Sequence, residues 1–193
     1  MSYYFSNDEN VKTNEIKHRV TINGVSFTFI TDNGVFSKRG LDFGTRTLLE
    51  NLPNLKGEVL DFGCGYGPIG IFLKKTYSCH VDMIDINRRS LSLAKKNAEE
   101  NQVEVNIFES DVYQNINKKY DFIITNPPIR VGKEKLYEIL MGADGYLKEN
   151  GELWFVIHKD QGAKTALRDL NQKYDAKLIV KNKGFYVICA KKH

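Results

Sequence analysis

Short apolar runs alternate with polar segments of helical period from Gly57 to the end of the chain. The runs are rich in β-branched and aromatic residues and end at turn-forming residues, which is typical of buried strands. Strands that alternate with helices predict an α/β fold, in which helices cover both faces of a mostly parallel sheet. Seven strands are predicted, at residues 58–62, 80–86, 104–109, 120–125, 151–158, 176–181 and 185–190.

One helix and one reversed strand follow from the local pattern. Leu91, Ala94 and Ala98 recur at three- and four-residue spacing within residues 87–101, which predicts a helix with lysine and glutamate side chains in solvent. The last two strands are joined by residues 182–184, a length that suits a hairpin and is too short for a parallel crossover. One strand of the sheet should therefore run antiparallel to the others.

The segment before Gly57 carries elements of its own. Residues 19–30 predict a small hairpin with its turn at Asn23-Gly24, and residues 41–52 predict a helix. No repeat, low-complexity tract or linker separates these elements from the rest of the chain. They are expected to extend the domain that the sheet forms.

Composition indicates one domain of ordinary size, since the 193 residues are 41% hydrophobic and 11% aromatic. We expect a single domain over residues 1–193, with residues 1–56 as an N-terminal extension of a core at residues 57–193. The N-terminus carries Asp8 and Glu9 where a signal peptide would need a basic start, and no apolar run is long enough to span a membrane. A cytoplasmic protein without a membrane partner is expected.

Cysteine, histidine and net charge narrow the chemistry only slightly. The three cysteines lack a Cys-x-x-Cys pair and the four histidines are scattered, so neither disulfides nor a metal site is expected. The net charge of +4 is compatible with nucleic acid without requiring it. For the C-terminal lysines, a solvated surface and a binding face both stay open; they are Lys173, Lys177, Lys181, Lys183, Lys191 and Lys192.

Asn126-Pro127-Pro128-Ile129 follows the apolar run 122–125 and is the most informative motif. Proline fixes φ and has no N–H, so the backbone turns sharply and presents carbonyl oxygens without competing donors. The Asn126 amide oxygen and the Pro127 carbonyl can then both accept hydrogens from one planar exocyclic amine. Two acceptors favour the pyramidal geometry in which the nitrogen lone pair attacks carbon, so the motif suits methylation of an amino group.

A glycine-rich turn follows the first strand of the sheet. Gly63, Gly65 and Gly67 come directly after the buried run 58–62, and a helix is expected next. Glycines let a ligand approach bare N–H groups, so this turn predicts a cofactor site. Gly65-x-Gly67-x-x-Gly70 formally matches the dinucleotide fingerprint. In dinucleotide-binding proteins, however, the fingerprint begins directly at the end of the strand, whereas Gly65 comes four positions after Asp61. This difference in register disfavours NAD as the cofactor.

Carboxylates stand at the ends of the first three predicted strands. They are expected to share one site with the two turns, because open α/β sheets bind ligands along the rim where the carboxyl ends of the strands meet. Asp85 can accept hydrogen bonds from both ribose hydroxyls, whereas Asp82 is interpreted as a polar residue at a strand start. For Asp111, a ligand contact and an ordinary loop aspartate both stay open, since Ser-Asp is common in turns. The third carboxylate is Asp61.

Asp61 followed by Gly63-x-Gly65-x-Gly67 resembles the first motif of class I S-adenosylmethionine-dependent methyltransferases, which have a Rossmann-like fold. The resemblance implies S-adenosylmethionine as the cofactor. It implies that the Asp61 carboxylate faces the methionine end, directly or through water, and that the glycines leave room for the amino-acid moiety and the ribose. It also implies that the region of Asp111 reads the adenine amino group.

Along nearly its whole length the chain resembles the methyltransferase small domain group, the catalytic half of bacterial small-subunit ribosomal RNA guanine-N2 methyltransferases. The resemblance implies methylation of a guanine N2 amine in 16S ribosomal RNA, with the RNA or the small ribosomal subunit as partner. It also implies that residues 36–45 pack over the methionine end and help to wall the acceptor pocket. The residues that carry it are Gly34-Val35-Phe36-Ser37-Lys38, Leu41-Asp42-Phe43-Gly44-Thr45, 61–67 and Asn126-Pro127-Pro128-Ile129-Arg130-Val131-Gly132-Lys133.

The motif and the resemblance together imply catalytic roles for Asn126, Pro127 and Pro128. Asn126 is also expected to lie beside the cofactor. His158, at the end of the fifth strand, is interpreted as an ordinary strand-end histidine rather than an RNA contact. A guanine would have to leave any helix, while nearby cations hold phosphates. The expected substrate or RNA contacts are Phe36, Ile129, Arg130, Lys133 and Lys159.

Other acceptors stay open. Adenine-N6 and glutamine-N5 methyltransferases share Asn-Pro-Pro but place an aromatic residue where this chain has Ile129. The alternatives are therefore N5-methylation of a protein glutamine, as in release-factor modification, and a module that only binds S-adenosylmethionine or RNA. The intact Asn-Pro-Pro argues against a module that only binds, because binding alone does not need that edge. The oligomeric state does not follow from the sequence.

Overall fold

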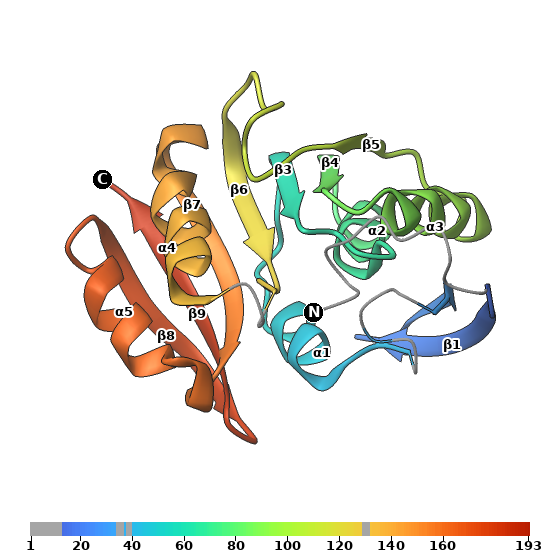
Figure 1. The fold of residues 1–193 in the computed structure, drawn as a ribbon, viewed down its shortest axis with the longest axis horizontal. Coiled ribbons are helices and arrows are strands. Elements are labelled where there is room, and N and C mark those ends of the chain that lie inside the picture. The colour runs from blue at the N-terminus through green and yellow to red at the C-terminus, as the bar shows by residue number, and fades with distance from the viewer. Residues whose placement is uncertain (1–12, 34–36, 38–39, 129–131) are drawn as a thin grey trace.

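The computed structural model describes residues 13–33, 37, 40–128 and 132–193. It contains a seven-stranded sheet and a separate two-stranded hairpin (Figure 1). The strand order of the large sheet is β5-β4-β3-β6-β7-β9-β8. Its strands are β3 (Gly57–Phe62), β4 (Cys79–Asp85), β5 (Asn106–Glu109), β6 (Tyr120–Thr125), β7 (Leu147–His158), β8 (Tyr174–Asn182) and β9 (Phe185–Lys192).

Strand direction in the large sheet matches the prediction. The pairs β3–β4, β3–β6, β4–β5 and β6–β7 are parallel. β9 pairs antiparallel with both of its neighbours, β7 and β8, so it runs against the rest of this sheet. Lys183 and Gly184, with φ angles of 45° and 85°, form the short turn between β8 and β9.

Side chains alternate along the strands and so divide the core into two layers. On β3, Val59 belongs to one apolar cluster, whereas Leu60 and Phe62 belong to the other. Helices cover both faces of the sheet, as predicted (Figure 1). Helices α1 (Phe43–Glu50), α2 (Pro68–Thr76) and α3 (Arg88–Glu100) pack in the first layer, and α4 (Gly132–Gly142) and α5 (Ala163–Leu170) pack in the second.

The connection from β5 to β6 consists of turns, not a helix. Tyr113 and Ile116 from this connection are buried in the second apolar layer. The Tyr113 ring stacks on Tyr146 at 4.5 Å, and its hydroxyl donates to the Ile139 carbonyl at 2.8 Å. A packed loop therefore fills the place of a crossover helix. Two short 3-10 helices, η1 (Ala143–Tyr146) and η2 (Lys159–Gln161), flank β7.

The small hairpin forms as predicted, from β1 (Ile16–Ile22) and β2 (Val25–Thr31). Its turn residues Asn23 and Gly24 both have positive φ, which the twist of a two-residue hairpin loop requires. Phe27 packs against Phe72 of α2, with ring centres 5.7 Å apart, and so joins the hairpin to the first layer of the core.

Two predicted helices begin at capping side chains. The helix predicted at residues 87–101 forms as α3, where the N-cap Asn87 side chain accepts from the Ser90 N–H at 3.1 Å. The helix predicted at residues 41–52 forms as α1 and is shorter than predicted, and its N-cap Asp42 accepts from the Thr45 N–H at 3.1 Å. In the part of the chain that the structure describes, none of the helices has the length and apolar character needed to cross a membrane.

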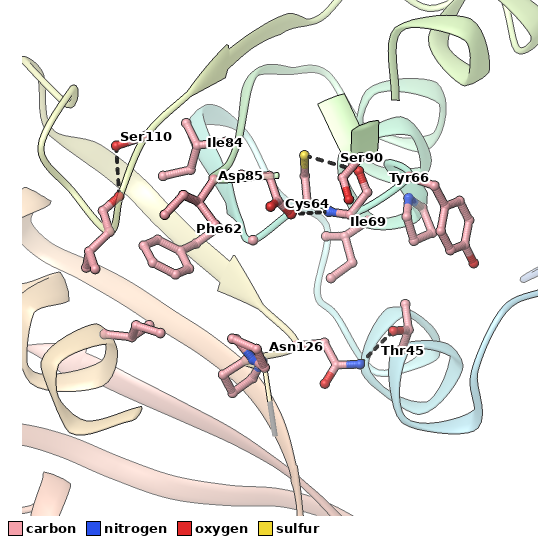
Figure 2. Close-up of a pocket in the computed structure, with 18 of the residues that line it drawn as sticks. Thr45, Phe62, Cys64, Tyr66, Ile69, Ile84, Asp85, Ser90, Ser110 and Asn126 are labelled. Carbon is pink, nitrogen blue, oxygen red and sulfur yellow. Dashed lines mark hydrogen bonds between the residues drawn. The ribbon is translucent and has the colours of Figure 1, made fainter. Parts of the chain in front are cut away.

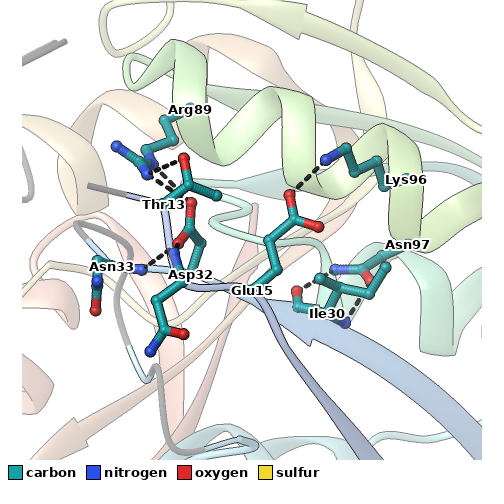
Figure 3. A network of polar contacts seen from close by, with 9 residues as sticks. Thr13, Glu15, Ile30, Asp32, Asn33, Arg89, Lys96 and Asn97 are labelled. Carbon is teal, nitrogen blue, oxygen red and sulfur yellow. Dashed lines mark hydrogen bonds and ion pairs between the residues drawn. The ribbon is translucent and has the colours of Figure 1, made fainter. Parts of the chain in front are cut away.

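Two asparagine side chains, Asn97 of α3 and its C-cap Asn101, join this helix to the edge of β2, and Figure 3 shows the contact of Asn97 with Ile30. Asn97 accepts from the Ile30 N–H at 2.6 Å and donates to the Ile30 carbonyl at 2.9 Å. Asn101 makes the same pair of bonds with Thr28. The spacings agree, because four helical residues rise about 6 Å and two strand residues about 6.6 Å. Asn97 also donates to the carbonyl of Tyr66 at 2.8 Å, so this seam reaches the glycine loop.

Candidate active site

The loop between β3 and α2 forms one wall of the site. Gly63, Gly65 and Gly67 have positive φ angles of 68°, 56° and 95°, which residues with a side chain rarely adopt. A Cβ built at Gly63 or Gly65 would meet no atom within 4 Å, so the loop borders open space there. At Gly67 a Cβ would lie 2.9 Å from Met83, so packing also requires that glycine.

A cavity of about 620 Å³ opens in front of this loop (Figure 2). It lies at the carboxyl ends of β3, β4, β5 and β6, the rim on which the sequence placed the candidate residues. The predicted site residues that line it are Gly63, Gly65, Asp85, Asp111, Asn126, Pro127 and Pro128. Other lining residues include Asp42, Thr45, Tyr66, Ser90, Lys135 and Ile139.

Asp85 presents its carboxylate at the end of β4. One oxygen accepts from the Gly65 N–H at 2.9 Å, and the other accepts from the Asn87 N–H at 2.8 Å. Burial raises the pKa of Asp85, and these N–H groups act in the opposite direction. Each oxygen keeps lone-pair capacity toward the cavity, so the side chain can accept two hydroxyl donors.

Asp61 lies behind the loop and does not line the cavity. Its side chain is fully buried, and one oxygen accepts from the Gly70 N–H at 2.8 Å in the first turn of α2. The other oxygen has no hydrogen-bond partner among the described residues. Burial, together with the charge of Asp85, raises the pKa of Asp61 to about 8. The predicted role of Asp61 at the methionine end stays a prediction.

Asp111 follows Ser110 at the end of β5 and lines the cavity. Its carboxylate lies 3.3 Å from the Lys135 ammonium of α4. The Ser110 hydroxyl is engaged within its own loop, because it donates to the Val112 carbonyl and accepts from the Asn115 N–H. The Asp111 carboxylate therefore remains the acceptor available at this position.

The Asn-Pro-Pro turn begins where β6 ends. The Asn126 amide donates to the Thr45 hydroxyl at 2.9 Å, a contact visible in Figure 2, and lies 3.4 Å from an Asp42 carboxylate oxygen. Thr125, just before the turn, donates its hydroxyl to the Phe62 carbonyl at 2.8 Å. The turn is thus fixed to both the sheet and α1, and it lines the same cavity as the glycine loop.

Three predicted contacts fall outside the described residues, and two predicted lysine contacts are exposed. Phe36, Ile129 and Arg130 are outside the residues that the structure describes. Lys133 is exposed in the first turn of α4, with its ammonium 5.3 Å from the centre of the Tyr137 ring. His158 accepts from the Asp160 N–H and packs edge-on against Phe185, which accounts for it as a cap of η2. Lys159 is also exposed.

Asp85 lines the cavity and Asp82 does not, in agreement with the preference for Asp85 in the sequence analysis. Its carboxylate accepts from the buried Tyr120 hydroxyl at 2.7 Å and pairs with Lys118 at 3.0 Å. Within the described ranges, no group of three or more metal-ligating side chains could hold a metal ion.

Lys135, Ile139 and Tyr66 line the cavity although they are not among the predicted site residues. Lys135 and Ile139 lie four residues apart on one face of α4, a helical spacing that could have indicated them. Tyr66 is almost fully buried, and its hydroxyl has no hydrogen-bond partner in the described structure. Burial and the nearby Asp42 charge raise the pKa of Tyr66. No signal beyond its place between two glycines marks Tyr66 in the sequence.

Residues 26–189 match the model of the methyltransferase small domain family. The chain belongs to this family. The match and the fold confirm a class I S-adenosylmethionine-dependent methyltransferase, with S-adenosylmethionine as the cofactor.

Three relatives show how far this likeness reaches. The uncharacterized protein YbxB of Bacillus subtilis is 42% identical over 197 residues, and the match covers 98% of each chain. The ribosomal RNA small subunit methyltransferase C of Psychromonas ingrahamii is 37% identical over 161 residues, which cover 80% of this chain and 45% of that one. The solved T. thermophilus 16S rRNA N2 G1207 methyltransferase, in complex with S-adenosylmethionine and guanosine, has a TM-score of 0.83 at 25% identity and covers 93% of this chain and 51% of that one. The chain thus spans about half the length of the relatives named for ribosomal RNA.

Proposed function

We propose that this methyltransferase transfers a methyl group to the N2 amine of a guanine in small-subunit (16S) ribosomal RNA, in the cytoplasm. The observation that carries the proposal is that one cavity joins the glycine loop to the Asn-Pro-Pro turn. The names of the Psychromonas and T. thermophilus relatives, and the guanosine bound to the latter, support this acceptor. The substrate is the RNA or the assembled small subunit.

The residues present fit the cofactor. The open space at Gly63 and Gly65 admits the amino-acid moiety and the ribose, and Gly67 lets the loop pass over Met83. Asp85 accepts from the ribose hydroxyls with the capacity that its backbone donors leave free. Asp111 accepts from the adenine amino group. Asp61 acts from behind the loop, by holding the first turn of α2.

The acceptor edge supplies the catalytic contribution of this chain. When bound, S-adenosylmethionine supplies an electrophilic methyl group, whose bond to sulfur breaks as the bond to nitrogen forms. The Asn126 oxygen and the Pro127 carbonyl hold the two hydrogens of the amine and so stabilise the pyramidal nitrogen of the transition state. Pro128 keeps the turn rigid. The surplus proton leaves the product nitrogen for water.

RNA contacts are assigned to the surface around this edge. Lys133 and Lys159 are exposed and free to approach phosphates. Arg130 is proposed to hold phosphates with these lysines, and Phe36 and Ile129 are proposed to contact the flipped nucleotide.

The test of function is nucleoside mass spectrometry of ribosomal RNA from a strain that lacks this protein. We expect one N2-methylguanosine to disappear from the small-subunit RNA and to return on complementation. A parallel incubation with labelled cofactor offers ribosomal subunits and release factor as acceptors. Label in a release-factor glutamine would replace the proposal with protein N5-methylation. An unchanged nucleoside profile together with no transfer to any RNA would favour a module that only binds.

The test of mechanism is Asn126→Ala. Loss of one preorganised group at the reacting centre typically costs about 10²–10³-fold in kcat, and we expect a loss of that size. Cofactor affinity, measured by calorimetry, should stay at the wild-type value, because the glycine loop and Asp85 are untouched. Wild-type turnover by Asn126→Ala would overturn the mechanism.

A further inference from the structure

The start of α1 contacts the catalytic asparagine from across the cavity. Asp42 is the N-cap of this helix, and one of its oxygens accepts from the Thr45 N–H at 3.1 Å. The same oxygen lies 3.4 Å from the Asn126 amide nitrogen, and the Thr45 hydroxyl lies 2.9 Å from that nitrogen. Thr45 is buried, and Asp42 and Asn126 are partly buried.

These contacts decide which way the Asn126 amide faces. A carboxylate only accepts hydrogen bonds, so the group turned toward Asp42 must be the amide NH₂. The two hydrogens of that NH₂ are directed at Asp42 and Thr45. The Asn126 oxygen takes part in neither contact and can only accept a hydrogen bond. A flipped amide would place its oxygen against the Asp42 carboxylate and would offer the substrate a donor.

We propose that Asp42 and Thr45 are positioning residues that fix Asn126 as an acceptor, and that Asp42 is the reason this position holds asparagine and not aspartate. The inference rests on the proposed function, since it assumes that Asn126 receives the substrate amine. It follows that the group that receives the methyl must carry N–H donors. A substrate that offered only a carbonyl or a carboxylate would find no hydrogen-bond donor on Asn126.

The first test exchanges the two side chains. Asn126→Asp alone places a second carboxylate beside Asp42 and removes the donor, so we expect kcat to fall about 100-fold. In Asp42→Asn/Asn126→Asp the amide at 42 can donate to the carboxylate at 126 and still cap α1. We expect the double variant to recover at least tenfold over Asn126→Asp, a non-additivity that paired residues show and independent residues do not. A double variant as slow as Asn126→Asp would overturn the role of Asp42.

The second test isolates the hydroxyl of Thr45. Thr45→Val removes it at nearly constant volume and should lower kcat about tenfold, with the KM for the cofactor unchanged. Thr45→Ser restores the hydroxyl and should restore most of the rate. Thr47→Val is the matched control, because Thr47 is buried on the same helix and its hydroxyl donates to the Phe43 carbonyl at 2.8 Å. Equal losses in Thr45→Val and Thr47→Val would overturn the assignment.

A third measurement does not depend on turnover. The side-chain NH₂ of Asn126 is assigned by ¹⁵N NMR from the signals that disappear in Asn126→Ala. We expect its hydrogen exchange to be slow in the wild type, severalfold faster in Thr45→Val, and unchanged in Thr47→Val. Equal exchange in all three proteins would overturn the positioning of the amide. If the wild type transferred no methyl group while the exchange pattern held, the proposed function would fail and the positioning of the amide would stand.

Discussion

Acidic side chains along the central strands are held in different ways. Before the carboxyl ends are reached, they meet cations. Asp121, near the start of β6, lies 2.8 Å from the Lys148 ammonium, and Asp82, in the middle of β4, pairs with Lys118 at 3.0 Å. At the carboxyl ends, Asp85 is held by the backbone N–H groups of Gly65 and Asn87.

The pKa values of Asp121 and Asp85 shift in opposite directions. Burial alone would raise the pKa of Asp121, but the hydrogen bond and charge of Lys148, together with the hydrogen bond from the Glu58 N–H, bring it below its usual value. Burial raises the pKa of Asp85, and the backbone N–H groups only oppose it. On β4, Asp82 is satisfied within the protein by Lys118 and the Tyr120 hydroxyl, whereas Asp85 is ordered by backbone N–H groups and keeps capacity for a ligand. The distinction belongs to β4, because Asp111 lines the cavity and also pairs with Lys135.

Asp85→Ala is the change with the largest expected effect on this comparison. It removes the proposed acceptor of the ribose hydroxyls, and hydrogen bonds to charged groups contribute about 1.5–3 kcal/mol. Calorimetry should therefore show cofactor affinity about 100-fold weaker, or roughly 2.7 kcal/mol. An unchanged Kd would remove Asp85 from the site and contradict the distinction between Asp82 and Asp85 on β4.

Asp82→Ala is the matched change, three residues earlier on the same strand. It leaves the buried Tyr120 hydroxyl without its acceptor and Lys118 without one of its partners. We expect the free energy of unfolding in urea to fall by about 2 kcal/mol, with the cofactor Kd unchanged. A weakened Kd at full stability would reverse the assignments of Asp82 and Asp85.

The pH dependence of stability sharpens the comparison at Asp61. Its pKa is about 8 in the folded protein, above the usual value of 3.8, so between these limits the folded state holds a proton that the unfolded state has released. Asp61 should therefore make stability fall as pH rises through this window, by up to about 1.4 kcal/mol per pH unit.

Urea unfolding at pH 5, 6 and 7 measures this slope. Asp61→Asn keeps an acceptor for the Gly70 N–H but cannot ionise, so the variant should lose less stability per pH unit than the wild type. Parallel slopes for the two proteins would mean that the Asp61 carboxyl does not hold a raised pKa.

Most of the architecture could be predicted from the sequence, because the architecture depends on local patterns. Short apolar runs between polar segments predicted the seven strands, the short link at 182–184 predicted the reversed strand, and the Asn23-Gly24 turn predicted the hairpin. The turns between β5 and β6 were not anticipated in detail, because Tyr113 and Ile116 fill that space through tertiary packing and not through a periodic pattern.

The sequence allowed the residues along the rim of the site to be predicted, but not how their side chains are oriented or buried. Residues at strand ends converge in any parallel sheet, so Asp85, Asp111 and Asn126 share the cavity as expected. The orientation of the Asn126 amide was not predictable, because Thr45 precedes it by 81 residues and meets it only in the folded chain. The burial of Asp61 depends on α2 covering its side of β3, which the strand pattern alone does not give.

The asparagine seam along α3 links the hairpin to the cofactor loop thermodynamically. Asn97 donates to the carbonyls of both Ile30 and Tyr66, and the Phe29 ring of β2 packs edge-on against the Tyr66 ring at 5.7 Å, so opening of the hairpin removes contacts that order the loop. A ligand that binds only the ordered loop stabilises every state in which the loop is ordered. Cofactor binding should therefore suppress local opening of a two-stranded element that contributes no strand to the large sheet.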